Sequence, residues 1–269
     1  MKKLFLFTTC FFSILNCYSQ ASEAFLKEGN RKLIIHDYNA AIVSYNKAIE
    51  INQSSAESYT QRGYAKGMLL DYQGAIEDYN KSIELDPSKI YPYVQRGLVK
   101  IILKDYQGAI VDCTKAIEIN PKDSIEYYLR GDAKYELQDY RGAISDYNKA
   151  IEISPSYASA YLKRAFAKSM IQDYKTAILD YSNALELNPN DAEIYSNRGF
   201  AKASLQDYRG AIEDYNKAIE INPKDAISYS NRGIAKIGLN QKDSGCLDFS
   251  KAGELGFEKA YDLIKKYCN

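Results

Sequence analysis

The chain is poor in several residue types. It has no tryptophan, one histidine (His36), six prolines and five cysteines among 269 residues. No CxxC pair or histidine-rich spacing indicates a metal site. No Ser/His/Asp set, phosphate-binding loop or zinc motif indicates catalysis. The sequence therefore predicts no enzyme, no cofactor and no metal, and it places His36 in a solvated turn.

An excess of charge of one sign is also missing. Lys and Arg together number 35, as do Asp and Glu, and the two signs are interspersed along the chain. This balance gives no reason to expect nucleic acid or an anionic membrane as a partner. After the first twenty residues no segment is long and apolar enough to span a bilayer, so the mature chain is not expected to insert into one.

The first nineteen residues have the pattern of an export signal. Two lysines precede an apolar run, residues 4–15, which fits a signal peptide and is short for a transmembrane helix. Small residues at −3 and −1 would allow cleavage before Gln20. Alternatively, residues 14–17 loosely resemble a lipoprotein box, with Cys17 carrying a lipid anchor. The chain is therefore expected to be exported, either periplasmic or secreted, or else anchored at the outer membrane. A third alternative is that the segment is retained as an anchor.

A 34-residue repeat occupies the rest of the chain. An Asp-Tyr pair recurs at this period without a slip, at residues 37–38, 71–72, 105–106, 139–140, 173–174 and 207–208. A seventh copy starts at Ala226 and decays after Leu239. The second copy reads Tyr59-x2-Arg62-Gly63, then Ala75-x3-Tyr79, then Pro87. This period and spacing resemble the tetratricopeptide repeat, in which each unit pairs a helix A with a helix B.

The resemblance implies an all-α fold, a right-handed α-solenoid of seven helical hairpins followed by a capping helix. Within residues 22–256, units are expected to start near residues 22, 56, 90, 124, 158, 192 and 226, as one array and not two domains. Stacked hairpins bury the apolar faces that one hairpin leaves exposed. Residues 257–269 are expected to form the capping helix, with Gly253 and Gly256 interrupting the hairpin before it.

Binding is expected where the repeats differ. Counted from the start of a unit, positions 2, 5, 9, 12 and 13 of helix A lie away from the core-facing side. The resemblance implies that they line a concave groove that holds a protein or peptide partner. Large apolar residues there indicate a partner; alternatively, Phe166 or Phe200 packs on the next helix A. The candidate groove residues are Tyr64, Val94, Leu98, Tyr128, Asp132, Leu162, Phe166, Phe200 and Ile234.

Family members that hold the carboxylate terminus of cytosolic chaperones use Lys and Asn on this side. Only Asn30 matches, and Leu26 stands where a Lys would be needed, so that function is not expected. Two hypotheses remain. The chain is either a scaffold that binds a segment of an envelope protein, or a self-associating architectural subunit or tethered lipoprotein of an envelope assembly. The oligomeric state is open.

An arginine at position 7 and an aspartate at position 23 recur in six of the seven units. Both positions are equally distant from the hairpin turn, so antiparallel helices place them at one height. The first unit has Glu28 and Ser44 instead, so both members are missing together. Structural ion pairs are favoured over a charged binding stripe: Arg62–Asp78, Arg96–Asp112, Arg130–Asp146, Arg164–Asp180, Arg198–Asp214 and Arg232–Asp248.

Three cysteines lie outside the signal segment. Gly256 marks a turn, with Cys246 ten residues before it and Cys268 twelve after it. Antiparallel packing would bring these two to about the same height, and an oxidising compartment permits a disulfide. Alternatively, Cys246 fills an apolar site and Cys268 frays at the chain end. Cys113 stands in place of a repeat tyrosine and is expected to be a buried thiol.

Overall fold

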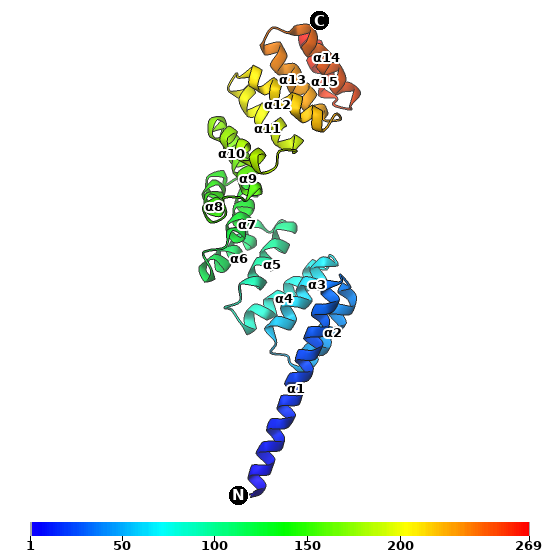
Figure 1. Cartoon of the computed structure of the whole chain (residues 1–269), viewed down its shortest axis with the longest axis vertical. Helices are drawn as coiled ribbons and strands as arrows, with labels where there is room; N and C mark the ends of the chain where they lie inside the picture. Colours follow the sequence, from blue (N-terminus) through cyan, green and yellow to red (C-terminus); the bar gives the residue numbers. More distant parts are fainter. Residues whose placement is uncertain (1, 269) are drawn as a thin grey trace. The chain divides into compact units, whose positions relative to one another are not determined.

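A computed structural model describes residues 2–268, with side chains from Tyr18 onward (Figure 1). The side chains of most of the expected export signal, residues 1–19, including Cys17, therefore lie outside the described part. Among the residues that the structure describes, no helix combines the length and the apolar character needed to cross a membrane.

Consecutive helices pack in antiparallel pairs, and the described chain has no strand. The chain divides into two compact units, residues 1–133 and 134–269, where the sequence predicts one array. Each unit is described by itself. The first contains α1 (Lys2–Ile34), α2 (Tyr38–Ile51), α3 (Ala56–Met68), α4 (Tyr72–Leu85), α5 (Ile90–Ile102) and α6 (Tyr106–Ile119).

The division falls inside α7 (Ser124–Glu136), so the fourth hairpin is split between the units. The second unit continues with α8 (Tyr140–Ile153), α9 (Ala158–Met170), α10 (Tyr174–Leu187), α11 (Ala192–Ser204), α12 (Tyr208–Ile221), α13 (Ala226–Gly238), α14 (Lys242–Glu254) and α15 (Lys259–Tyr267). Odd-numbered helices up to α13 are the A helices and even-numbered ones the B helices, which is the predicted α-solenoid of helical hairpins.

The turn inside each hairpin is built from two adjacent residues. In the second hairpin Leu70 adopts a left-handed backbone, with φ of 66°, which lets the Asp71 N–H donate to the Lys66 carbonyl at 3.0 Å and close α3. The Asp71 carboxylate then accepts from the Gly74 N–H at 3.0 Å and caps α4. The same aspartate cap opens α2, α6, α8, α10 and α12.

Glycine on helix A makes room for an aromatic ring on helix B. A Cβ on Gly63 would lie 2.9 Å from Cε1 of Tyr79, whose side chain is buried. Phe249 meets Gly233 in the same way in the seventh hairpin. Cys113 takes the ring's place in the third hairpin and is buried there, as the sequence predicts. Hairpin interfaces within the two units are therefore thin, and several alanines fill them together with one ring or, in the third hairpin, with Cys113.

The C-terminal cap differs from its prediction in one detail. Gly253 lies inside α14 and is buried, so the expectation that it interrupts this helix is wrong; a single glycine costs a helix only about 1 kcal/mol. Gly256, with φ of 91°, makes the turn into α15. The structure joins Cys246 of α14 to Cys268 after α15 in a disulfide, with their Cα atoms 5.8 Å apart.

Candidate functional site

The repeated arginines and aspartates lie inside the hairpins. Arg62 of α3 donates from Nε and Nη2 to both carboxylate oxygens of Asp78 of α4, at 2.9 and 2.6 Å. Lys66 Nζ approaches the same carboxylate at 2.9 Å. The Asp78 side chain is only 4% exposed, so the three groups form a buried ion network. This geometry favours a structural role over a binding stripe.

Four more hairpins have the same geometry, with Arg Nη2 to Asp Oδ1 distances of 2.5–2.6 Å: Arg96–Asp112, Arg164–Asp180, Arg198–Asp214 and Arg232–Asp248. Arg130 and Asp146 belong to different units, so their pairing stays a prediction. Within its own unit, Asp146 binds Lys134 at 2.7 Å.

The same arginines also link consecutive hairpins, which sequence reasoning missed. Arg62 Nη1 donates to the Asn46 side-chain oxygen of the preceding hairpin at 2.7 Å. Its guanidinium lies 5.3 Å from the centre of the Tyr59 ring. The equivalent partners are Asn80 for Arg96, Thr114 for Arg130, Asn148 for Arg164, Ser182 for Arg198 and Asn216 for Arg232. The recurrence of Asn, Ser or Thr at position 25 was the available signal.

Two of the candidate groove residues of the first unit line an apolar hollow. Tyr64 of α3 and Leu98 of α5 line it, and its volume is about 420 Å³. Three neighbouring apolar side chains are largely exposed: Met68 is 45% exposed, Ile102 49% and Leu70 71%. Because apolar surface in water is costly, this cluster is a candidate contact for a partner.

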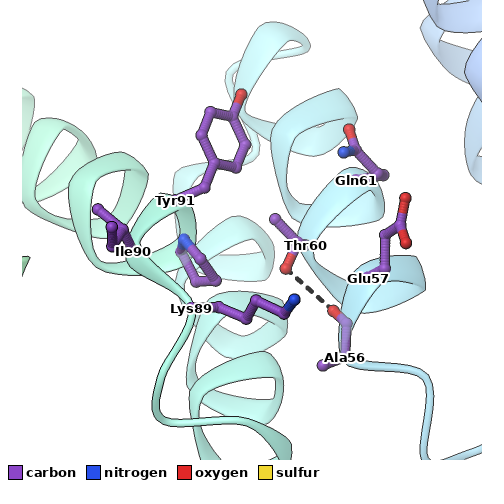
Figure 2. A pocket seen from close by; sticks show the side chains of 8 residues that line it. Ala56, Glu57, Thr60, Gln61, Lys89, Ile90 and Tyr91 are labelled. Atoms are coloured by element: carbon purple, nitrogen blue, oxygen red, sulfur yellow. Dashed lines mark hydrogen bonds between the residues drawn. The ribbon is translucent and has the colours of Figure 1, made fainter. Parts of the chain in front are cut away.

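A second, more polar hollow lies between the start of α3 and the start of α5. Figure 2 shows Glu57 and Gln61 on α3, Tyr91 on α5, and Lys89 extending towards α3. The Thr60 hydroxyl donates to the Ala56 carbonyl at 2.9 Å. This hollow offers donors and acceptors beside the apolar one.

Tyr91 lines the polar hollow, and Tyr64 and Tyr79 line the apolar one. Burial, together with the neighbouring Tyr91 and Tyr64 side chains, raises the pKa of Tyr79 above its usual range. Burial and the proximity of Tyr64 likewise raise the pKa of Tyr91. These phenols are therefore protonated at neutral pH and can donate hydrogen bonds.

The candidate residues of the second unit differ from one another in burial. Leu162 and Phe166 pack against the buried core around Tyr181, and the Phe166 and Tyr181 rings meet edge to face at 5.9 Å between centroids. Phe200 is 48% exposed, and its ring meets Tyr174 of the preceding hairpin at 6.2 Å. Ile234 is 42% exposed. Phe166 is therefore partly a core residue, whereas Phe200 and Ile234 offer surface.

The other three candidates, Val94, Tyr128 and Asp132, are half-buried in the first unit. A further buried group there was not predicted. Glu126 of α7 is 4% exposed, and one carboxylate oxygen is without a hydrogen-bond partner. Burial, with nearby Asp123, raises the pKa of Glu126. The equivalent residues Ser58 and Ser228 are small, which is the signal that sequence reasoning overlooked.

Comparison with known families agrees with this architecture. Family models described as TPR repeat match residues 29–69, 131–170 and 171–206, and models described as tetratricopeptide repeat match residues 56–89, 90–123 and 192–225. Together they cover more than half of the chain. No curated protein sequence matches it significantly.

Solved structures share the fold at low sequence identity. YrrB, described as a TPR protein with an unusual peptide-binding site, is 23% identical, with a TM-score of 0.62 over 68% of this chain and 95% of its own. A tetratricopeptide repeat protein from Parabacteroides merdae is 22% identical, with a TM-score of 0.65 over 93% and 100%. The C-terminal part of a TPR repeat-containing protein from Cytophaga hutchinsonii is 19% identical, with a TM-score of 0.75 over 88% and 98%.

The 34-residue period, the capped hairpins and the family matches agree along the chain. The protein belongs to the tetratricopeptide-repeat family.

Proposed function

We propose that this protein is a scaffold that binds a peptide segment or a partner protein along the A-helix faces of its two units. The observation that carries the proposal is the apolar hollow at Tyr64 and Leu98 with its exposed neighbours. The charged residues that recur in these repeats pair with one another inside the hairpins, whereas the residues at the groove positions vary from one repeat to the next. A function that depends on one asymmetric partner requires such variation.

The expected export signal indicates the compartment in which the proposed partner would be found. A chain with a signal at residues 1–19 would meet its partner in the periplasm, at the outer membrane or outside the cell. Intact mass of the chain purified from an envelope fraction separates the two signal types. A chain beginning at Gln20 indicates ordinary cleavage, and a lipid adduct on Cys17 indicates an anchor.

A different set of exposed residues favours self-association as a second candidate. Position 22 of helix B is apolar in alternate hairpins, and the four residues there are 55–71% exposed: Val43, Val111, Leu179 and Leu247. Such residues occur singly on many surfaces, so they carry less weight than the clustered residues of the hollow. Light scattering after size-exclusion chromatography distinguishes a monomer from an assembly.

The test of the proposal compares groove variants with matched variants outside the groove. The full chain serves as bait for an envelope fraction, with bound proteins identified by mass spectrometry. Leu98→Ser and Phe200→Ser should each lose a partner that Val111→Ser and Leu179→Ser retain. Loss with the second pair alone would contradict groove binding and would support self-association or another surface.

A further inference from the structure

In the second unit, a ring of the protein itself lies at the place that corresponds to the hollow of the first unit. Leu98 corresponds to Phe200, Tyr72 to Tyr174 and Tyr64 to Phe166, since each pair differs by three repeats. In the second unit the Phe200 ring lies edge to face on Tyr174, with centroids 6.2 Å apart. In the first unit Tyr72 and Leu98 instead line an open hollow of about 420 Å³.

A second residue difference between the two units leaves further space in the first unit. Gly67 of α3 lines the hollow, and a Cβ there would meet only the Ala75 methyl, at 3.9 Å. Its counterpart in α9 is Ser169, whose hydroxyl lies 3.3 Å from the Tyr181 hydroxyl. The first unit therefore has a smaller side chain at one of these places, Leu98 for Phe200, and none at the other, Gly67 for Ser169.

We propose that the hollow between α3, α4 and α5 is a subsite for one aromatic side chain, Phe, Tyr or Trp, of an extended partner peptide. The inference rests on the proposed function and specifies the chemistry of its partner. Phe200 against Tyr174 provides the internal precedent for a ring at this repeat interface. The volume is ample, since an apolar cavity of about 150 Å³ already accepts benzene.

The surroundings favour an uncharged ring with a peptide backbone attached. Lys66 and Lys100, the lysines on the two flanking A helices, are bound to buried Asp78 and Asp112 at 2.9 and 2.8 Å. They therefore present no unpaired charge to the hollow. Tyr64 and Gln95 also line the hollow, and a tyrosine hydroxyl and a glutamine amide can donate to the carbonyls of an extended chain.

The methionines provide matched reporters of the two sites. The chain has three, Met1, Met68 and Met170. Met68 lines the open hollow, and Met170 holds the same repeat position in the second unit. In the full chain labelled with 13C-methyl methionine, the probe N-acetyl-phenylalanine amide is titrated against N-acetyl-alanine amide.

The Met68 methyl resonance should shift and saturate with the phenylalanine probe, with a dissociation constant on the order of 1 mM for so small a ligand. It should not respond to the alanine probe, and Met170 should respond to neither. Equal shifts at Met68 and Met170, or no saturable shift at Met68, would overturn the proposal.

Exchanging Leu98 and Phe200 tests whether the residue at this repeat position decides which unit binds the probe. Leu98→Phe copies the second unit and should weaken binding at Met68 by at least about tenfold. Phe200→Leu should make Met170 responsive. Both changes keep an apolar side chain at an exposed position, and circular dichroism verifies the fold. Unchanged Met68 binding in a folded Leu98→Phe chain would refute the assignment.

The outcomes also separate this inference from the proposed function. If Leu98→Phe leaves capture of the envelope partner unchanged while Leu98→Ser and Phe200→Ser abolish it, the groove binds a partner without an aromatic anchor. If no groove variant affects capture but Met68 still binds the probe, the subsite exists and the partner binds elsewhere.

Discussion

Two equivalent places in the molecule share the same hairpin architecture but differ in their surfaces. One is the interface of the second and third hairpins, and the other is the interface of the fifth and sixth. Both keep the buried arginine–aspartate pair and the aspartate cap. They differ at position 9, where Leu98 leaves a hollow and Phe200 covers it. Residues common to the repeats hold the hairpins together, and residues that vary among them decide what the surface binds.

The largest expected effect tests the common residues. Asp112→Ala and Asp214→Ala each remove a buried carboxylate that a half-buried arginine and lysine share, which should cost about 2–3 kcal/mol of unfolding free energy. Because the network is the same at both places, the two losses should agree. Urea unfolding followed by circular dichroism measures them.

Exposed ion pairs provide the control for these variants. Glu118→Ala and Glu220→Ala remove the solvent-exposed partners of Lys115 and Lys217 and should cost under about 1 kcal/mol. A loss at Asp112 or Asp214 no larger than that of these controls would contradict the structural role of the network.

The next effect, of similar size, concerns the disulfide of the second unit. Replacing Cys246 and Cys268 by serine should destabilise the last hairpin and α15 by about 3 kcal/mol, given the length of the closed loop. Hydrogen exchange should accelerate in α13–α15 and stay unchanged in α1–α6. Alkylation of Cys113, Cys246 and Cys268 without prior reduction would show that the bond does not form.

A smaller effect separates the two phenylalanines of the second unit. Phe166→Ser should cost about 2 kcal/mol, since its half-buried ring packs on Tyr181 and full burial of Phe is worth about 3–5 kcal/mol. Phe200→Ser, at an exposed site, should cost under about 1 kcal/mol. The melting temperatures of the two variants compare them directly, and equal losses would remove the distinction between core and groove here.

The smallest effect belongs to a residue that only the first unit has. Burial raises the pKa of Glu126, so the folded state holds its proton more strongly than the unfolded state does. Unfolding free energy should therefore decrease as pH rises from the ordinary carboxyl pKa through the raised value. Glu126→Gln should remove this pH dependence and should raise the unfolding free energy at neutral pH by up to about 1 kcal/mol. A difference between the two chains that grows towards acid pH would contradict this sign.

Much of the scaffold could be predicted because it repeats. The period, the Asp71-type caps and the positions of arginine and aspartate each recur, and antiparallel geometry relates position 7 to position 23. Asn46 and its counterparts were missed because they act between hairpins, where the relative height of the helices is not set by one turn. Gly253 was misjudged because glycine inside a helix and glycine at a turn look alike in sequence.

The groove could be predicted only in outline. Position 9 identifies Leu98, Phe166 and Phe200 as one class, but the sequence does not show that Phe166 packs on Tyr181 or that Phe200 reaches Tyr174. Those contacts depend on side-chain directions across two hairpins. The hollow follows from what Gly67 and Leu98 fail to fill, and such a vacancy becomes visible only once the neighbouring helices are placed.

The central claim is that a partner binds in the hollow of the first unit. Photo-crosslinking from one position in the hollow and one position outside it tests this claim most directly. A benzophenone amino acid replaces Gln95, which lines the hollow, or Val111, which is exposed on α6. With the full chain in an envelope fraction, the account predicts one partner adduct at position 95 that is lost on adding Leu98→Ser, and none at position 111. The same adduct at position 111 and none at position 95 would contradict it.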